Sequence, residues 1–201
     1  MTEKKYVFFF LGGPGAGKGT QCEKLVEKYP MSHFSTGDLL REEMVRPESE
    51  YGKLIKGLID EGKLVPGRIT TQLLLNAIRD SPNRVFLVDG FPRNHENQTT
   101  FDELADPNIF EVVKCVTLDV CRETMLKRIL KRAEYSGRSD DNEVAFNKRY
   151  QTFLDLTIPM IDFYGNKNQL LRIDGEGSID EVFTLVEKEF VDFLKEKNIP
   201  F

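Results

Sequence analysis

The chain has 201 residues, of which 40% are hydrophobic and 30% charged, which suits one globular domain with small insertions. A net charge of -5 excludes a broad basic surface for nucleic acid, so no nucleic-acid partner is expected. Met1–Lys5 is polar and leads into a short apolar run, without a signal-peptide core or a membrane-spanning stretch. These features predict a cytoplasmic protein, with the nucleus also compatible, and no membrane association.

Short apolar runs that alternate with helical segments set the expected architecture. The strand candidates are Tyr6–Leu11, Phe86–Val88, Val112–Val120 and Leu170–Ile173. The first is followed by Gln21–Tyr29, which has helical composition. Alternation of this kind is typical of a parallel α/β sheet with helices on both faces.

A glycine-rich loop stands between the first strand candidate and the first helix, with the sequence Gly-Gly-Pro-Gly-Ala-Gly-Lys-Gly-Thr over residues 12–20. Glycines let the backbone turn its N–H groups inward at a helix N-terminus, which makes a nest for anions. Lys18 adds a point charge for the β- and γ-phosphates of a nucleotide, so the loop predicts nucleotide binding. Gly19 stands where such loops usually carry a Ser or Thr, which argues against the usual direct bond between a hydroxyl and magnesium.

Two stretches depart from the alternating pattern. Ser35–Pro66 is rich in charge and in short helices, and Arg132–Asn142 is a polar loop that contains Gly137. We expect both to be insertions at the ends of strands, because ligands of open α/β sheets bind at that edge.

Asp89 ends the apolar run Phe86–Val88. A carboxylate in that place is how P-loop proteins hold magnesium, often through water. Asp89 could alternatively cap the turn at Gly90, but the glycine-rich loop favours the magnesium function.

The arginines suit a phosphate site, because phosphoryl transfer depends mainly on positioned positive charge. Arg128 and Arg132 are four residues apart and share a helix face, and Arg138 and Arg149 follow. Asp140 and Asp141 would either orient these arginines or cap the next helix.

The last helix is predicted from an apolar stripe at helical spacing, and this stripe is expected in the core. The stripe consists of Ile179, Val182, Phe183, Val186, Phe190, Phe193 and Leu194. Ser178 and Glu181 form a capping-box pattern at its start.

The segments GGPGAGKGT, STGDLLR, DGFPR and SGRSDDN together resemble the nucleoside monophosphate kinase family of adenylate kinases and UMP-CMP kinases, over essentially the whole chain. The resemblance implies a P-loop NTPase fold, α/β, with a five-stranded parallel sheet flanked by helices. It also implies a single domain over residues 1–201, with a monophosphate-binding insert at about 35–65 and a short, zinc-free lid at about 132–142. The implied reaction moves the γ-phosphoryl of ATP, bound with Mg²⁺, to a nucleoside monophosphate. The small size of the chain and its self-contained site favour a monomer.

The resemblance also implies roles for individual residues. The ATP site would comprise Gly13, Pro14, Gly15, Ala16, Gly17, Lys18, Gly19, Thr20, Arg128, Arg132 and Gly177. The acceptor site would comprise Thr36, Arg41, Lys63, Leu64, Val65, Gly90, Phe91, Pro92, Arg93, Asn97, Arg138 and Arg149. Charge on the transferred group would be stabilised by Lys18, Arg93, Arg132, Arg138 and Arg149, and Asp89 would hold Mg²⁺ through water.

The acceptor base is expected to be read by few residues. Asn97 resembles the UMP-CMP branch, and its carboxamide can both donate and accept at the edge of cytosine or uracil. The expected acceptors are therefore UMP and CMP, with dCMP also. Thr36 resembles the adenylate kinase branch instead, so AMP is the alternative acceptor. A P-loop module that only holds or hydrolyses ATP is a third hypothesis, which leaves Arg41 and Asp89–Asn97 unexplained.

Overall fold

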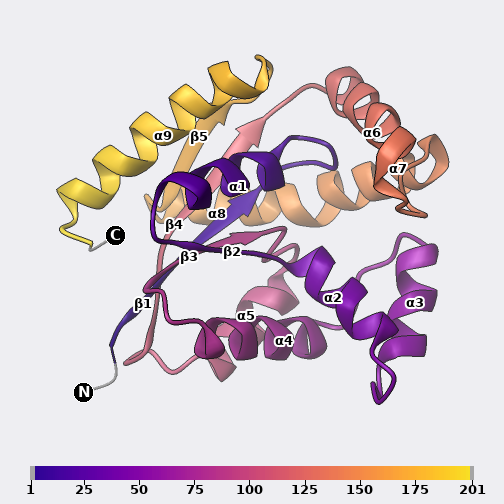
Figure 1. The fold of residues 1–201 in the computed structure, drawn as a ribbon, viewed down its shortest axis with the longest axis horizontal. Coiled ribbons are helices and arrows are strands. Elements are labelled where there is room, and N and C mark those ends of the chain that lie inside the picture. The colour runs from indigo at the N-terminus through magenta and orange to yellow at the C-terminus, as the bar shows by residue number, and fades with distance from the viewer. Residues whose placement is uncertain (1–2, 200–201) are drawn as a thin grey trace.

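The computed structural model describes residues 3–199, and its centre is one five-stranded sheet (Figure 1). Every neighbouring pair of strands is parallel, and the order across the sheet is β2-β3-β1-β4-β5. The strands are β1 (Lys5–Leu11), β2 (Ser32–Ser35), β3 (Val85–Asp89), β4 (Phe110–Asp119) and β5 (Leu170–Asp174). The expected α/β fold with a five-stranded parallel sheet is confirmed.

Helices cover both faces of this sheet (Figure 1). They are α1 (Lys18–Lys28), α2 (Thr36–Val45), α3 (Gly52–Asp60), α4 (Gly67–Asp80), α5 (His95–Leu104), α6 (Arg122–Ser136), α7 (Glu143–Thr152), α8 (Ile158–Asn166) and α9 (Ile179–Glu196). A π-helical turn, η1 (Phe153–Thr157), joins α7 directly to α8. The helices α1 and α9 pack on one face, and α4, α5 and α8 pack on the other.

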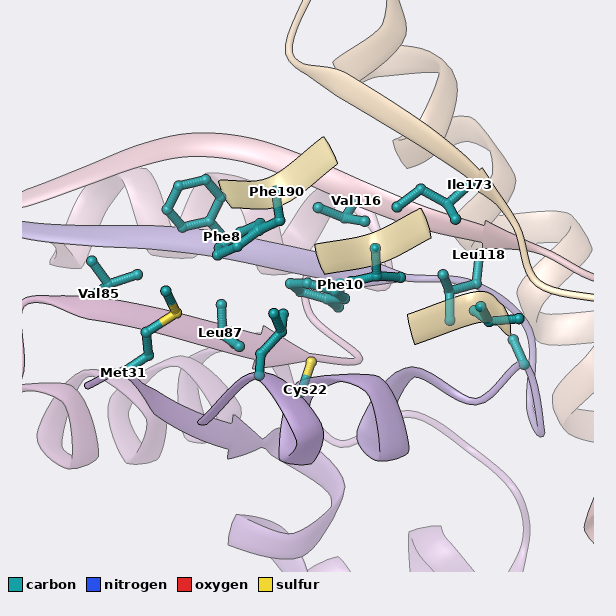
Figure 2. Close-up of a cluster of buried hydrophobic side chains, with 14 of the residues drawn as sticks. Phe8, Phe10, Cys22, Met31, Val85, Leu87, Val116, Leu118, Ile173 and Phe190 are labelled. Carbon is teal, nitrogen blue, oxygen red and sulfur yellow. The ribbon is translucent and has the colours of Figure 1, made fainter. Parts of the chain in front are cut away.

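Strand alternation divides the core into two apolar layers. Phe8 and Phe10 of β1 point into the layer under α1 and α9, shown in Figure 2, whereas Phe9 points into the layer under α4, α5 and α8. All three are fully buried, and burial of each such side chain contributes about 1.5–3 kcal/mol. Because β1 is apolar on both faces, it holds the centre of the sheet and fixes where the following loop emerges.

The four strand candidates are confirmed, with ends that differ by one or two residues, but they omitted β2. Its sequence, Ser-His-Phe-Ser, contains one apolar residue, and all four residues are only half-buried at the edge of the sheet. An edge strand of this kind carries no apolar run, so periodicity could not find it. The first helix begins at Lys18, three residues before the predicted start.

Two further expectations need correction. Ile179 opens the apolar stripe of α9 but is 57% exposed, so the packed part of the stripe begins at Val182. The capping box of Ser178 and Glu181 is confirmed. Arg132 was placed in a polar loop, yet α6 continues to Ser136 and ends at Gly137 in the left-handed conformation. Within residues 3–199, no helix has the length and apolarity needed to cross a membrane.

Candidate functional site

The glycine-rich loop lies at the carboxyl edge of the sheet, between the end of β1 and the start of α1. Gly15 and Gly17 adopt positive φ angles of 82° and 96°. A Cβ on Gly15 would stand 2.5 Å from the backbone oxygen of Met125, so α6 packs directly on the loop. The helix α1 begins at Lys18, and its first N–H groups therefore face the cleft, as an anion site requires.

Lys18 is held by the loop itself. Its Nζ donates to the carbonyl oxygens of Gly12 and Gly13, both at 3.0 Å, and lies 3.9 Å from Oδ1 of Asp89. Burial lowers the pKa of Lys18, an effect that Asp89 opposes. The charge is therefore desolvated and close to the position that a bound phosphate would take.

Asp89 ends β3 beside the loop, where its Oδ2 lies 3.5 Å from the position that a Cβ on Gly19 would take. No group of three or more His, Cys, Asp or Glu residues within 3–199 could hold a metal ion on its own. Mg²⁺ keeps several waters and binds through one or two carboxylates together with substrate phosphates. A single carboxylate next to the phosphate loop fits that mode of binding.

Two half-buried arginines face the same space. Arg93 follows the turn after β3 and a cis bond between Phe91 and Pro92, and its Nε donates to the oxygen of Gly90 at 2.8 Å. Arg149 lies on α7 and pairs with Asp140 at 2.6 Å. Burial lowers the pKa of Arg149 to about 10, and the positive charge of Arg93 contributes to that shift. Two like charges held in a desolvated cleft create a strong preference for a polyanion.

Two carboxylates between α6 and α7, Asp140 and Asp141, pair with arginines of these helices. Arg132 makes a two-pronged pair with Asp141, with Nε to Oδ2 at 2.8 Å and a nitrogen of the fork to Oδ1 at 2.5 Å. Ser136 donates to Asp141 at 2.7 Å, and the Asp141 side chain is fully buried. Asn142, not an aspartate, caps α7, so of the two functions open to Asp140 and Asp141 the structure supports the orientation of arginines.

Asp38 of α2 links this helix to the loop between α6 and α7, a role that sequence reasoning did not identify. Its Oδ1 accepts from Arg41 at 2.7 Å and from Arg138, one hundred residues further along the chain, at 3.0 Å. The helices α2, α3, α6 and α7 lie on the same side of the molecule in Figure 1. Asp38 stands within the STGDLLR segment, so the signal was present, but its partner on the lid was not predictable from local spacing.

A cleft of about 530 Å³ lies between these groups, a volume suited to a nucleotide-sized ligand. Most of the expected site residues line it together: Pro14, Gly15, Gly17, Lys18, Gly19, Thr20, Thr36, Arg41, Lys63, Leu64, Val65, Asp89, Gly90, Arg93, Asn97, Arg132, Arg138 and Arg149. The expected residues outside this lining are Gly13, Ala16, Phe91, Pro92, Arg128 and Gly177. Phe91 packs in the core against Phe9 and Phe101, so only its backbone is available to a ligand.

Arg128 links the phosphate loop to the segment after β5. Its guanidinium donates to the carbonyl oxygens of Ala16 at 3.3 Å, Gly175 at 2.8 Å and Gly177 at 3.0 Å. Arg128 and Arg132 both lie on α6, as expected. The guanidinium of Arg128 points away from the cleft, toward these backbone oxygens.

The two residues expected to read the base are both buried at the cleft wall. Oδ1 of Asn97 accepts from the backbone N–H of Arg93 at 3.0 Å, whereas its Nδ2 donates to no group within residues 3–199. The hydroxyl of Thr36 lies 3.1 Å from the carbonyl oxygens of both Asp89 and Gly90. Asn97 thus keeps a free donor, while the single hydroxyl hydrogen of Thr36 is committed to the turn.

A phosphate loop, a strand-end carboxylate and converging arginines on a parallel sheet define a P-loop phosphotransferase. The chain matches the family model described as adenylate kinase over residues 10–169. It is 45% identical to a UMP-CMP kinase of Xenopus laevis over 93% of this chain and 99% of that protein. It is 44% identical to a UMP-CMP kinase of Homo sapiens over 93% of this chain and 97% of that protein, and 46% identical to one of Danio rerio over 92% and 96%. The chain belongs to the adenylate kinase family, and it is a nucleoside monophosphate kinase.

Proposed function

We propose that the chain transfers the γ-phosphoryl group of ATP to UMP or CMP, and also to dCMP, forming ADP and the nucleoside diphosphate. The observation that carries this choice is the Nδ2 group of Asn97, a donor left free in the cleft wall. Uracil and cytosine both offer a ring carbonyl oxygen to such a donor. The similar proteins of frog, human and fish bear the name UMP-CMP kinase, which supports the same choice.

In this proposal the chain acts by holding charge in place. Lys18 and the loop N–H groups bind the donor phosphates, and Arg132 lies on the lid side of the cleft. Arg93, Arg138 and Arg149 contact the acceptor phosphate and the group in transfer, where their N–H groups stabilise charge on the phosphoryl oxygens. The α2–α3 insert and the lid bring these arginines together and exclude water, which suppresses ATP hydrolysis.

Mg²⁺ is part of the proposal, with Asp89 as the residue that would hold it through water. When bound, the ion would neutralise charge on the phosphate oxygens of ATP. The position of Asp89 beside Lys18, at 3.9 Å, supports this assignment.

An ADP-forming assay coupled to NADH oxidation, with UMP, CMP, dCMP and AMP offered separately, tests the acceptor. We expect the highest kcat/KM with UMP or CMP, and a preference for AMP would overturn the proposal. ATP consumption without any acceptor would instead favour a nucleotide-hydrolysing module. Size-exclusion chromatography with light scattering tests the proposed monomer.

Substitution of Asn97 tests how the base is read. Asn97→Asp keeps an oxygen for the N–H of Arg93 but lacks the Nδ2 donor. Loss of one hydrogen bond of about 0.5–1.5 kcal/mol lowers kcat/KM for UMP and CMP by roughly two- to thirteenfold. The KM for ATP serves as the internal control, since Asn97 lies at the acceptor side. Unchanged kcat/KM for both pyrimidines would exclude Asn97 as the base-reading residue.

The hydroxyl of Thr36, which favoured AMP at the level of sequence, supports the turn in this proposal. A hydroxyl has one hydrogen, and that of Thr36 lies between two backbone oxygens. Thr36→Ala is therefore expected to affect UMP, CMP and AMP alike. A selective loss of AMP phosphorylation would restore Thr36 as a base-reading residue.

A further inference from the structure

The π-helical turn η1 interrupts an otherwise continuous helix that runs from Glu143 to Asn166. Such turns are rare, contain one residue more than an α-helical turn, and occur frequently at functional sites. Here Thr157, at the end of the turn, lines the cleft together with Arg149 and Phe153. Leu156, its neighbour, is 41% exposed instead.

The extra residue determines which of these two side chains faces the cleft. With 3.6 residues per turn, residues seven apart on an α-helix differ by about 20° around the axis, and residues eight apart by about 80°. An uninterrupted helix would therefore place Leu156 nearly in line with Arg149. The π-helical turn contains one residue more than an α-helical turn. Thr157 is therefore the residue in line with Arg149, and Leu156 lies at the surface.

The side chain of Thr157 is nearly fully buried and contacts Arg93. Its Oγ1 donates to the carbonyl oxygen of Arg93 at 3.0 Å. Asn97 accepts from the N–H of the same residue at 3.0 Å, and Gly90 accepts from its Nε at 2.8 Å. Arg93 is thus held at its backbone N–H, its backbone oxygen and its Nε, which leaves its terminal nitrogens for an anion.

Hydrogen bonds to uncharged partners, rather than ion pairs, hold Arg93 in this orientation. Arg149 pairs with Asp140 at 2.6 Å, whereas Arg93 makes no ion pair with a carboxylate of residues 3–199. Three residues hold Arg93: Gly90, Asn97 and Thr157. Of these, only Thr157 belongs to the helical segment that carries Arg149. Thr157 therefore links the position of Arg93 to the position of Arg149.

We propose that Thr157 is a positioning residue for phosphoryl transfer: it orients Arg93 through its backbone oxygen and sets its place relative to Arg149, and the π-helical turn serves to present it. This inference rests on the proposed role of Arg93. A displacement of about 1 Å of a group that contacts the reacting atoms lowers turnover by up to about 100-fold, so loss of this anchor acts on kcat.

Two substitutions separate the hydroxyl from the packing. Thr157→Val keeps the size and shape but lacks the donor, and Thr157→Ser keeps the donor but lacks the methyl group. We expect Thr157→Val to lower kcat by about tenfold or more, with the KM for ATP and UMP changed by less than about threefold. Thr157→Ser should stay within about twofold of the unsubstituted enzyme.

Thr71→Val is the matched control. Thr71 is also a fully buried threonine, but its hydroxyl has no partner among the described residues. Its replacement should leave kcat unchanged. All rates are normalised to the folded fraction measured by circular dichroism, so that a loss of stability is not counted as a loss of turnover.

A double-mutant cycle with Arg93→Ala decides whether Thr157 acts through Arg93. If it does, adding Thr157→Val to Arg93→Ala lowers kcat by less than about twofold further, because the group that Thr157 orients is gone. Additive losses, a normal kcat in Thr157→Val, or a tenfold loss in Thr157→Ser would each overturn the inference. Near-normal turnover of Arg93→Ala alone would instead contradict the proposed function of Arg93.

Discussion

Replacement of Gly15 by alanine tests how tightly the phosphate loop is packed under α6. Gly15 has a φ of 82°, and a Cβ there would lie 2.5 Å from the backbone oxygen of Met125 and 2.9 Å from Cγ1 of Ile129. Gly137 offers a matched control, because its φ is 64° but a Cβ there would meet no atom within 4 Å. Both substitutions impose the left-handed backbone on alanine, and only one of them forces α6 to move.

The magnitudes follow from these distances. A non-glycine residue in the left-handed region costs about 1–2 kcal/mol, and forcing an extra carbon into a packed site costs about 1–3 kcal/mol more. We therefore expect Gly137→Ala to lose about 1–2 kcal/mol and Gly15→Ala about 2–5 kcal/mol. For a chain of this size each 1 kcal/mol corresponds to about 2–4 °C in Tm.

Thermal unfolding followed by circular dichroism, together with titration of ATP and Mg²⁺, measures both consequences. Gly15→Ala should have the lower Tm and should bind ATP more weakly, because α6 carries Arg132 into the cleft. Equal Tm values and equal ATP affinities for the two variants would refute the argument from packing.

Three further outcomes are expected. Arg93→Ala and Arg138→Ala should each reduce kcat severely in the coupled assay, and near-normal turnover would contradict their roles. Inorganic phosphate should raise the Tm of the unsubstituted chain more than that of Arg149→Ala, because bound phosphate offsets the repulsion between Arg149 and Arg93. An equal rise in Tm would exclude Arg149 from the anion site. Although burial opposes it, hydrogen bonds from Arg132 and Ser136 hold the pKa of Asp141 below its ordinary value. The stability that Asp141 contributes is thus complete above about pH 4 and falls at lower pH, so the difference in unfolding free energy from Asp141→Asn, measured by urea titration, should shrink between pH 6 and pH 3.

The phosphate loop and the core strands were predictable because their signals are local. The glycines within residues 12–19 lie between an apolar run and a helical segment. This arrangement predicts a phosphate-binding loop and little else. The strand β1 is apolar on both faces, which marks a central strand without further information. The arginine cluster was likewise predictable, because guanidinium groups are the side chains that phosphate sites require.

Other features depend on contacts across the chain that no local pattern records. The strand β2 exists because β3 pairs with it, not because its own residues favour a strand. The single carboxylate of Asp38 is shared between Arg41 and Arg138, which are nearly one hundred residues apart. The π-helical turn keeps helical composition on both sides, so a count of periodicity cannot separate Leu156 from Thr157.

The shared carboxylate of Asp38 bears on the speed of turnover. Its side chain is 46% exposed, and those of Arg41 and Arg138 are 27% and 29% exposed. Ion pairs exposed to this degree contribute about 0.2–1 kcal/mol each and are screened by salt. Such a contact links α2 to the loop between α6 and α7, and it is weak enough for thermal motion to break it. If α2 and this loop separate to release product in the proposed reaction, we expect this contact to add little to the barrier.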